Sequence, residues 1–404
     1  MLIHTTAIAH VALLASATGL FVPQDEATAA PRSDVAVRIE RRCLAEMEKL
    51  HARASFPGAS LAIVLPGGEE VAVTVGVTDP DGGRALTPAD RMLSGSIGKT
   101  YVAAMALHLA SQDKLDLDAK ARDFFADEDW FQLLAGWESF TLRHLLRHQS
   151  GLKRYVFDPE FFKVVVAEPD KVWEPDELLA YVFDHEGLFA PGGGWAYADT
   201  NYIVLGIVLE KVAGQSMYEY VAEHFLGPKG LVDTVPSDQR RIPGLVQGHV
   251  RAFKGLGLPD RALVDCVFVI NPQFEWCGGG FCSTPLDLAR WARMLYSGSA
   301  FEGDYLDTLI DAVPANPRSL GPGSRYGPAC IIRDSALGEV RGHDGVMVGY
   351  QSAMGWFSEV DIAVAFQMNT DQDRKIGAPL PRLLVRFASI AAEELGLPAV
   401  EGDR

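Results

Sequence analysis

Ser96 and Lys99 stand three positions apart, directly before the apolar stretch Thr100 to Ala110. Residues at i and i+3 share one face of a helix, so the Lys99 amine can approach the Ser96 hydroxyl. A serine hydroxyl is a weak nucleophile until a base removes its proton, and an unprotonated lysine can serve as that base. The two residues are therefore a candidate nucleophile and base.

The S-x-x-K spelling is not unique in this chain, because residues 111–114 and 150–153 match it as well. Ser111 belongs to a polar helix end, and Gly151 breaks the helical geometry behind Ser150. Residues 98–100 also resemble the end of a phosphate-binding loop, but that motif requires glycine where this chain has Leu93. Only Ser96 precedes a long apolar helix that can hold it rigidly in a cleft.

Two further groups lie far along the chain. Tyr197 and Asp199 precede the helix expected at Asn201 to Val212, in a turn where side chains can point at a ligand. Asp199 is also a plausible helix N-cap. His343 lies between two glycines and before an expected strand, where backbone can approach a ligand closely.

In this order, the pieces resemble the serine β-lactamase and penicillin-recognising family. Its members share S-x-x-K, then Y-x-N, then K-T-G or H-x-G, which match residues 96–99, 197–199 and 343–345 here. The nearest branches are class C β-lactamases, D-alanyl-D-alanine carboxypeptidases, D-aminopeptidases and related esterases. The resemblance covers about residues 35 to 395, with supporting similarity at residues 56–60, 145–152 and 278–284.

The resemblance implies roles for the site residues. Ser96 would be the acylated nucleophile and Lys99 its base, while Tyr197 would pass a proton to the leaving group and help activate the deacylating water. The backbone N–H groups of Ser96 and Val346 would form the oxyanion hole. Lys99 must be neutral to act as a base, so we expect burial to lower its pKa, or Tyr197 to share the proton.

Asp199, His343, Asp344 and Gly345 would line the substrate site. Asp199 stands where asparagine is commoner in the family, and Asp344 stands where threonine usually helps to bind a substrate carboxylate. An anion at Asp344 would disfavour anionic ligands, unless it points away and pairs with an arginine such as Arg341 or Arg333.

Strand patterns at both ends of the chain and a helical middle predict an α+β fold. We expect a β-lactamase/transpeptidase-like antiparallel sheet from residues 34–100 and 310–400, flanked by helices, with a mainly helical insert at 101–309. The spacing of Ile39, Cys43, Met47 and Leu50 predicts the buried face of a first helix.

Composition excludes several classes of protein. The net charge is −17, and no block of Lys and Arg indicates a nucleic-acid partner. The five cysteines lack the spacing of a zinc site or of a disulfide framework, so we expect small buried residues. His144 and His148 have a zinc-compatible spacing but lack the protease motif. We expect no metal and no cofactor.

Residues 1–30 resemble a secretory signal, with an apolar run followed by small residues, although the run follows no Lys or Arg. They predict a periplasmic or secreted protein, or a cytoplasmic one if this segment is not a signal. No integral membrane domain is expected.

The sequence thus predicts a serine hydrolase that forms an acyl-enzyme on a small ester, amide or peptide, of D-peptidase or esterase type. The alternatives are a class C-like β-lactamase or D,D-carboxypeptidase, an acyltransferase, and a penicillin-binding protein without turnover.

Overall fold

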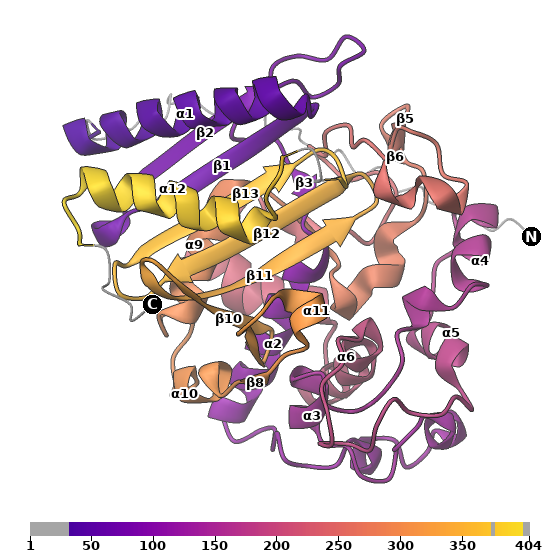
Figure 1. The fold of residues 1–404 in the computed structure, drawn as a ribbon. Helices are drawn as coiled ribbons and strands as arrows, with labels where there is room; N and C mark the ends of the chain where they lie inside the picture. The colour runs from indigo at the N-terminus through magenta and orange to yellow at the C-terminus, as the bar shows by residue number, and fades with distance from the viewer. Residues whose placement is uncertain (1–31, 373–375, 399–404) are drawn as a thin grey trace, which may run out of the picture.

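An eight-stranded antiparallel sheet runs through the middle of the molecule in this computed structural model, which describes residues 32–372 and 376–398 (Figure 1). Strands from both ends of the chain meet where β1 pairs with β13. In spatial order the strands are β2 (Glu70–Gly76), β1 (Gly58–Val64), β13 (Ile362–Met368), β12 (Tyr350–Phe357), β11 (Gly338–Met347), β10 (Cys330–Ser335), β9 (Arg325–Gly327) and β8 (Val313–Pro314). The predicted α+β class, with an antiparallel sheet from both chain ends, is confirmed.

Helices cover both faces of the sheet. Helices α1 (Asp34–Ala54) and α12 (Leu380–Glu394) lie side by side on one face, and α9 (Pro285–Tyr296) packs on the other (Figure 1). Every residue of β1 and of β13 is therefore buried, as expected for strands covered on both sides. The predicted buried face of the first helix, including Ile39 and Met47, is confirmed.

A helical region lies beside the sheet (Figure 1). It contains α2 (Lys99–Ser111), α3 (Leu142–Leu146), α4 (Phe161–Ala167), α5 (Pro175–Leu179), α6 (Asp199–Ala213), α7 (Met217–Val221), α8 (Gly227–Lys229), α10 (Leu306–Ile310) and α11 (Pro317–Leu320), with the short strands β3 (Met92–Leu93), β4 (Val235–Pro236), β5 (Leu263–Val264), β6 (Val267–Phe268) and β7 (Phe281–Ser283). One hydrophobic cluster joins α2 and α6 to the sheet face that α9 covers, through residues such as Ala62 and Met354.

Two details differ from the sequence-based expectations. His343 lies inside β11 rather than before a strand. The helix that the sequence predicts over residues 141–148 ends at Leu146, and His148 adopts a left-handed conformation with φ 58°. The proposed domain boundaries stay a prediction, and the signal-like residues 1–30 lie outside the described residues. No helix within the described ranges combines the length and apolarity needed to cross a bilayer.

Four of the five cysteines are buried, and Cys266 is exposed. All five are free thiols. The expectation of small buried residues is confirmed for four of them and is wrong for Cys266.

Substitution of Phe387 in α12 tests how this helix packs on the sheet. Its ring stacks on Phe366 of β13 with 5.9 Å between centroids, and both side chains are fully buried. Replacing a buried phenylalanine by alanine removes apolar contacts and leaves a cavity, so Phe387→Ala should lower the free energy of unfolding by about 3–5 kcal/mol in urea titrations. Val232→Ala, at a residue 73% exposed, should change it by less than about 0.5 kcal/mol. A loss below about 1 kcal/mol for Phe387→Ala would contradict this packing.

Candidate active site

Ser96 lies on the tight helical turn Gly95–Gly98, and Lys99 is the first residue of α2. The Lys99 Nζ donates a hydrogen bond to Ser96 Oγ at 3.3 Å. Ser96 precedes the apolar helix α2, as the sequence predicts, and its turn leads directly into that helix. The turn gives the i, i+3 approach that the motif predicts, and α2 behind it is almost entirely buried.

Glycines allow the middle of β11 to reach this turn. A Cβ on Gly95, whose φ is +53°, would lie 2.7 Å from the Val346 backbone nitrogen. A Cβ on Gly345 would overlap the Ser94 carbonyl oxygen and lie 3.1 Å from the Ser96 nitrogen. The backbones of Ser96 and Val346 therefore meet, as an oxyanion hole would require, and that role stays a prediction.

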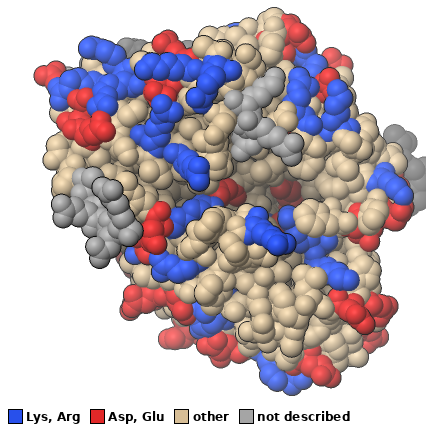
Figure 2. Space-filling model, viewed as in Figure 1, with Lys and Arg blue, Asp and Glu red and all other residues tan. Residues whose placement is uncertain are grey.

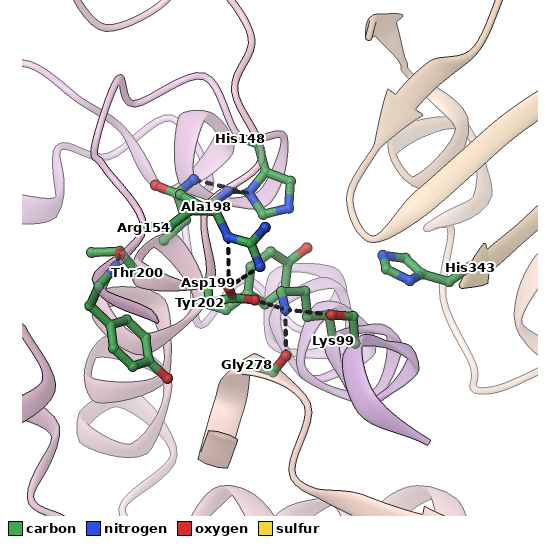
Figure 3. A network of polar contacts seen from close by, with 12 residues as sticks. Lys99, His148, Arg154, Ala198, Asp199, Thr200, Tyr202, Gly278 and His343 are labelled. Carbon is green, nitrogen blue, oxygen red and sulfur yellow. Dashed lines mark hydrogen bonds and ion pairs between the residues drawn. The ribbon is translucent and has the colours of Figure 1, made fainter. Parts of the chain in front are cut away.

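Lys99 is completely buried, and three oxygen atoms surround its ammonium group (Figure 3). The Nζ donates to Asp199 Oδ1 at 2.6 Å and to the Gly278 carbonyl, besides Ser96. Burial alone would lower the pKa of Lys99, but the Asp199 carboxylate and Tyr197 together raise it above its ordinary value. The expectation of a lowered pKa is wrong, because the site supplies a buried counter-ion. The alternative, that Tyr197 shares the proton, stays a prediction.

Asp199 has two cationic partners. Its Oδ2 accepts from Arg154 Nη2 at 2.6 Å and from Nε at 3.0 Å, while Oδ1 faces Lys99 (Figure 3). Burial alone would raise the pKa of Asp199, but Arg154 and Lys99 hold it well below its usual range. The N-cap interpretation is wrong, because Ala198 occupies that position and the Asp199 side chain bonds the two cations. Arg154 carried no motif that sequence reasoning could recognise.

Tyr197 lies against both cations. Its ring centroid is 5.0 Å from Lys99 Nζ and 5.2 Å from Arg154 Cζ. Burial raises the pKa of Tyr197 and Lys99 opposes that change, so the phenol is neutral at physiological pH. Its hydroxyl is buried without a hydrogen-bond partner among the described residues. It lies close enough to Ser96 for the serine hydroxyl to lower the pKa of Tyr197, against the effect of burial.

A chain of buried hydrogen bonds runs behind Tyr197 from α6 to β11. The Ala198 N–H and the Asn201 side chain approach His148 Nδ1 at 3.3 and 3.0 Å, and His148 Nε2 lies 3.2 Å from the Tyr326 hydroxyl. That hydroxyl lies 2.9 Å from His343 Nε2.

His343 Nδ1 lies 2.7 Å from the Asp344 carbonyl oxygen, which can only accept, so Nδ1 carries the proton. Burial, followed by Lys99, lowers the pKa of His343 to about 4, and burial lowers that of His148 as well. Both rings are neutral near pH 7. The directions of all the bonds then follow: Tyr326 donates to His343, and His148 donates to Tyr326.

Asp344 lies at the cleft and also pairs with an arginine. Its Oδ2 accepts from Arg333 Nη2 at 2.6 Å, which is one of the two pairings named as the alternative to an unpaired anion. The ion pair offsets the charge that was expected to disfavour anionic ligands. The effect of Asp344 on substrate choice stays a prediction.

The serines of the two other S-x-x-K matches, and the two histidines with zinc-compatible spacing, bond to groups outside the Ser96 site. The Ser111 hydroxyl donates to the His108 carbonyl, and Ser150 donates to the Asn201 side chain. His144 closes a capping box at the start of α3, while His148 hydrogen-bonds to Tyr326 in the buried series of hydrogen bonds behind Tyr197. The described ranges contain no group of three or more side chains arranged to hold a metal ion.

These groups meet at a cleft of about 940 Å³ that Ser96, Tyr197, Asp199 and His343 line. Figure 2 shows a hollow in this face, with basic side chains around it and acidic side chains visible inside. Figure 3 shows His343 on the strand side, facing Lys99 on the helical side. The arrangement offers a serine hydroxyl, a lysine and a neutral phenol to one bound molecule.

The Beta-lactamase family model matches residues 43–386, and the chain belongs to this family. Among curated proteins, Penicillin-binding protein 4* of Bacillus subtilis is 23% identical over 59% of this chain and 53% of its own length. A D-aminopeptidase of Brucella anthropi is 23% identical over 73% of this chain and 52% of its own length. The chain thus spans about half the length of the curated relatives it matches.

Solved structures show the same fold at low identity. A D-amino acid amidase from Ochrobactrum anthropi SV3 has a TM-score of 0.71 at 22% identity, covering 90% of this chain and 99% of its own. A D-stereospecific amidohydrolase from Streptomyces sp. has a TM-score of 0.68 at 24% identity, covering 85% and 96%. The predicted β-lactamase/transpeptidase-like fold is confirmed.

Asp199→Asn tests the charge balance around Lys99. Removing the carboxylate takes away the interaction that raises the pKa of Lys99 and one that raises the pKa of Tyr197, so either group loses its proton more readily. The rate at which a fluorophosphonate labels Ser96 should rise with pH in the wild type. In the variant, this rise should occur about 1–3 pH units lower. Asp118→Asn, at a surface pair with Arg143, is the control and should leave the profile in place. If the labelling rate of Asp199→Asn rose at the same pH as in the wild type, or at a higher pH, the account would be contradicted.

Tyr326→Phe tests the buried hydrogen-bond chain. The variant leaves His343 Nε2 and His148 Nε2 buried without their shared partner, which should cost about 1–3 kcal/mol of unfolding free energy in urea titrations. Tyr181→Phe, at a partly buried residue, should change it by less than about 0.5 kcal/mol. If the two variants lowered the unfolding free energy equally, the buried hydrogen bonds of Tyr326 would contribute nothing to stability.

Proposed function

We propose that the chain is a serine hydrolase that forms an acyl-enzyme on Ser96 and cleaves small amides or esters. The observation that carries this proposal is the 3.3 Å contact between Lys99 Nζ and Ser96 Oγ at the wall of the cleft. The names of the relatives support amides of D-amino acids and short D-peptides as the first substrate class to try.

In the proposed reaction, Ser96 Oγ attacks the carbonyl carbon while its proton passes to the Lys99 amine. The reaction starts from molecules in which Lys99 is neutral, which the raised pKa makes a minority near pH 7. The backbone N–H groups of Ser96 and Val346 hold the oxyanion as it forms. Tyr197 lies against Lys99 and lines the cleft, so its hydroxyl can donate a proton to the leaving amine.

Deacylation then requires a water molecule in place of the leaving group. Tyr197, having given up its proton, accepts one from this water, and the hydroxide attacks the ester carbonyl on Ser96. The ester bond to Ser96 Oγ then breaks, and Oγ takes back its proton from Lys99, which leaves the lysine neutral as at the start. Asp199 stays ionised throughout because Arg154 pairs with it. Asp199 and Arg154 therefore orient Lys99 and set its charge without touching the reacting carbonyl.

Ser96 should be the residue labelled by a fluorophosphonate, as mapped by mass spectrometry of peptides. Ser96→Ala should abolish both labelling and turnover of D-amino-acid p-nitroanilides. Lys99→Ala and Tyr197→Phe should each lower kcat about 10²–10⁴-fold, because each removes a positioned proton-transfer group. Lys114→Ala, in the competing motif beside Ser111, is the matched control and should retain wild-type kcat. An adduct on Ser111 or Ser150 would overturn the proposal.

Parallel assays with nitrocefin, a D-alanyl-D-alanine peptide and fluorescent penicillin separate the alternatives. Turnover of nitrocefin or of the peptide would identify a β-lactamase or a D,D-carboxypeptidase. A stable penicillin adduct without turnover of any substrate would identify a penicillin-binding protein that acylates only.

A further inference from the structure

Glu275 is a carboxyl group of the cleft that the reaction above does not use. It lies on the turn Pro272–Gly278 and lines the same cleft as Ser96 and Tyr197. Its Oε2 is buried, and no donor within the described parts of the chain hydrogen-bonds to it. A buried carboxyl oxygen without a donor is unfavourable in the empty protein, which makes it a candidate for binding a ligand.

The Glu275 carboxyl lies close to the nucleophile's own turn. A Cβ placed on Gly279 would lie 2.8 Å from Glu275 Oε1 and 2.9 Å from the carbonyl oxygen of Gly95, the residue before Ser96. Trp276, next to Glu275, has φ 35°, a left-handed conformation that is costly for a bulky residue. The turn therefore holds Glu275 beside the reacting centre at the expense of backbone strain.

Glu275 differs from the other acidic residues that line the cleft in the described part of the chain. Asp199 and Asp344 each pair with an arginine, and Asp158 accepts the N–H of Glu160 at 2.8 Å. Asp344 Oδ1 is also buried without a hydrogen-bond partner among the described residues, but its carboxylate has Arg333 as a cationic partner, which Glu275 lacks. Burial raises the pKa of Glu275 to about 8, while Lys99 opposes this shift and Asp199 adds to it. Glu275 is thus the acidic group here that gains most from a cationic partner.

Aromatic side chains from the helical region form part of the wall of the cleft. The rings of Phe162 and Phe253 lie 6.4 Å apart, and Phe274 packs against Phe162 at 6.2 Å. Phe157 is 72% exposed at the same cleft. This wall can accept a bulky apolar group next to a cation held by Glu275.

We propose that Glu275 binds the ammonium group of the substrate, so that the preferred acyl group carries a free amine and an apolar side chain. The inference rests on the proposed function, and it assigns the selection of the amine to one residue of this chain. Glu275 acts on binding, and it takes no part in the proton transfers at Ser96.

A matched substrate pair tests this assignment. D-Phenylalanine p-nitroanilide and 3-phenylpropionyl p-nitroanilide differ only in the amine. The wild type should favour the first in kcat/KM, and Glu275→Gln should lower this preference about ten- to hundredfold, mainly through KM, because it removes a charged hydrogen-bond partner. Glu210→Gln is the control, since Glu210 is a carboxyl that accepts the Met217 N–H away from the cleft. The Glu210→Gln variant should keep a substrate preference within about twofold of the wild-type value.

A second measurement needs no variant. 2-Phenylethylamine and the neutral 3-phenylpropanol are compared as competitive inhibitors of p-nitrophenyl butyrate hydrolysis by the wild type. The amine should inhibit at least tenfold more strongly at pH 8. Below that pH Glu275 gains a proton while the amine keeps its own, so the advantage should shrink about tenfold per pH unit.

The outcomes separate this inference from the proposed function. An unchanged substrate preference in Glu275→Gln, or equal inhibition by the amine and the alcohol, would overturn the role of Glu275 while Ser96 labelling stands. Failure of the wild type to label at Ser96 would overturn the proposed function itself. A wild-type preference for the substrate without the amine would also overturn the role of Glu275.

Discussion

The ion pair between Lys99 and Asp199 is the interaction on which the candidate site depends. The Lys99 side chain has no exposed surface. A buried ammonium group loses its proton unless an anion in the core stabilises its charge. Asp199 supplies that anion at 2.6 Å, and Arg154 supplies the second cation that keeps Asp199 ionised. The three side chains carry a net charge of +1. A lysine beside a neutral asparagine, the commoner arrangement in this family, would carry the same charge.

Backbone packing places the other groups around this charge. Three segments distant in the chain converge on the Gly95–Gly98 turn: β11 at Gly345, the Gly278–Gly280 run, and α6 through Asp199. A Cβ on Gly98 would overlap the Gly279 carbonyl oxygen, and Gly278 offers its own carbonyl to Lys99. The glycines therefore serve the close approach of backbones, while the His148–Tyr326–His343 chain joins the helical side to the sheet.

The sequence predicted the parts of the site that local spacing determines. Ser96 and Lys99 share a turn, and Tyr197 precedes α6, because helical geometry and helix boundaries can be read from neighbouring residues. The α+β class followed from strands at both ends of the chain. The family resemblance, confirmed by the family model, identified Gly345 and Val346 as neighbours of Ser96.

The electrostatics could not be predicted in the same way. The pKa of Lys99 depends on a carboxylate 100 positions away, and that carboxylate pairs with an arginine that has no motif of its own. Glu275 resembles any other glutamate in the sequence, and only the fold shows that no described donor bonds its Oε2. Likewise, Asp344 could be unpaired or paired until the fold placed Arg333 beside it. Such properties arise from long-range packing, which residue spacing does not encode.

The charge state of Lys99 is the most direct test of this account. NMR of the wild-type protein with ¹³Cε-labelled lysine, assigned with Lys99→Arg, follows the Lys99 signal as the pH is raised. We expect Lys99 to remain an ammonium up to and beyond about pH 10.4, the ordinary value for lysine, because its buried counter-ion favours the charge. A Lys99 signal that titrates below about pH 8 would contradict the account, because burial would then outweigh Asp199 and the site would hold a neutral lysine at rest.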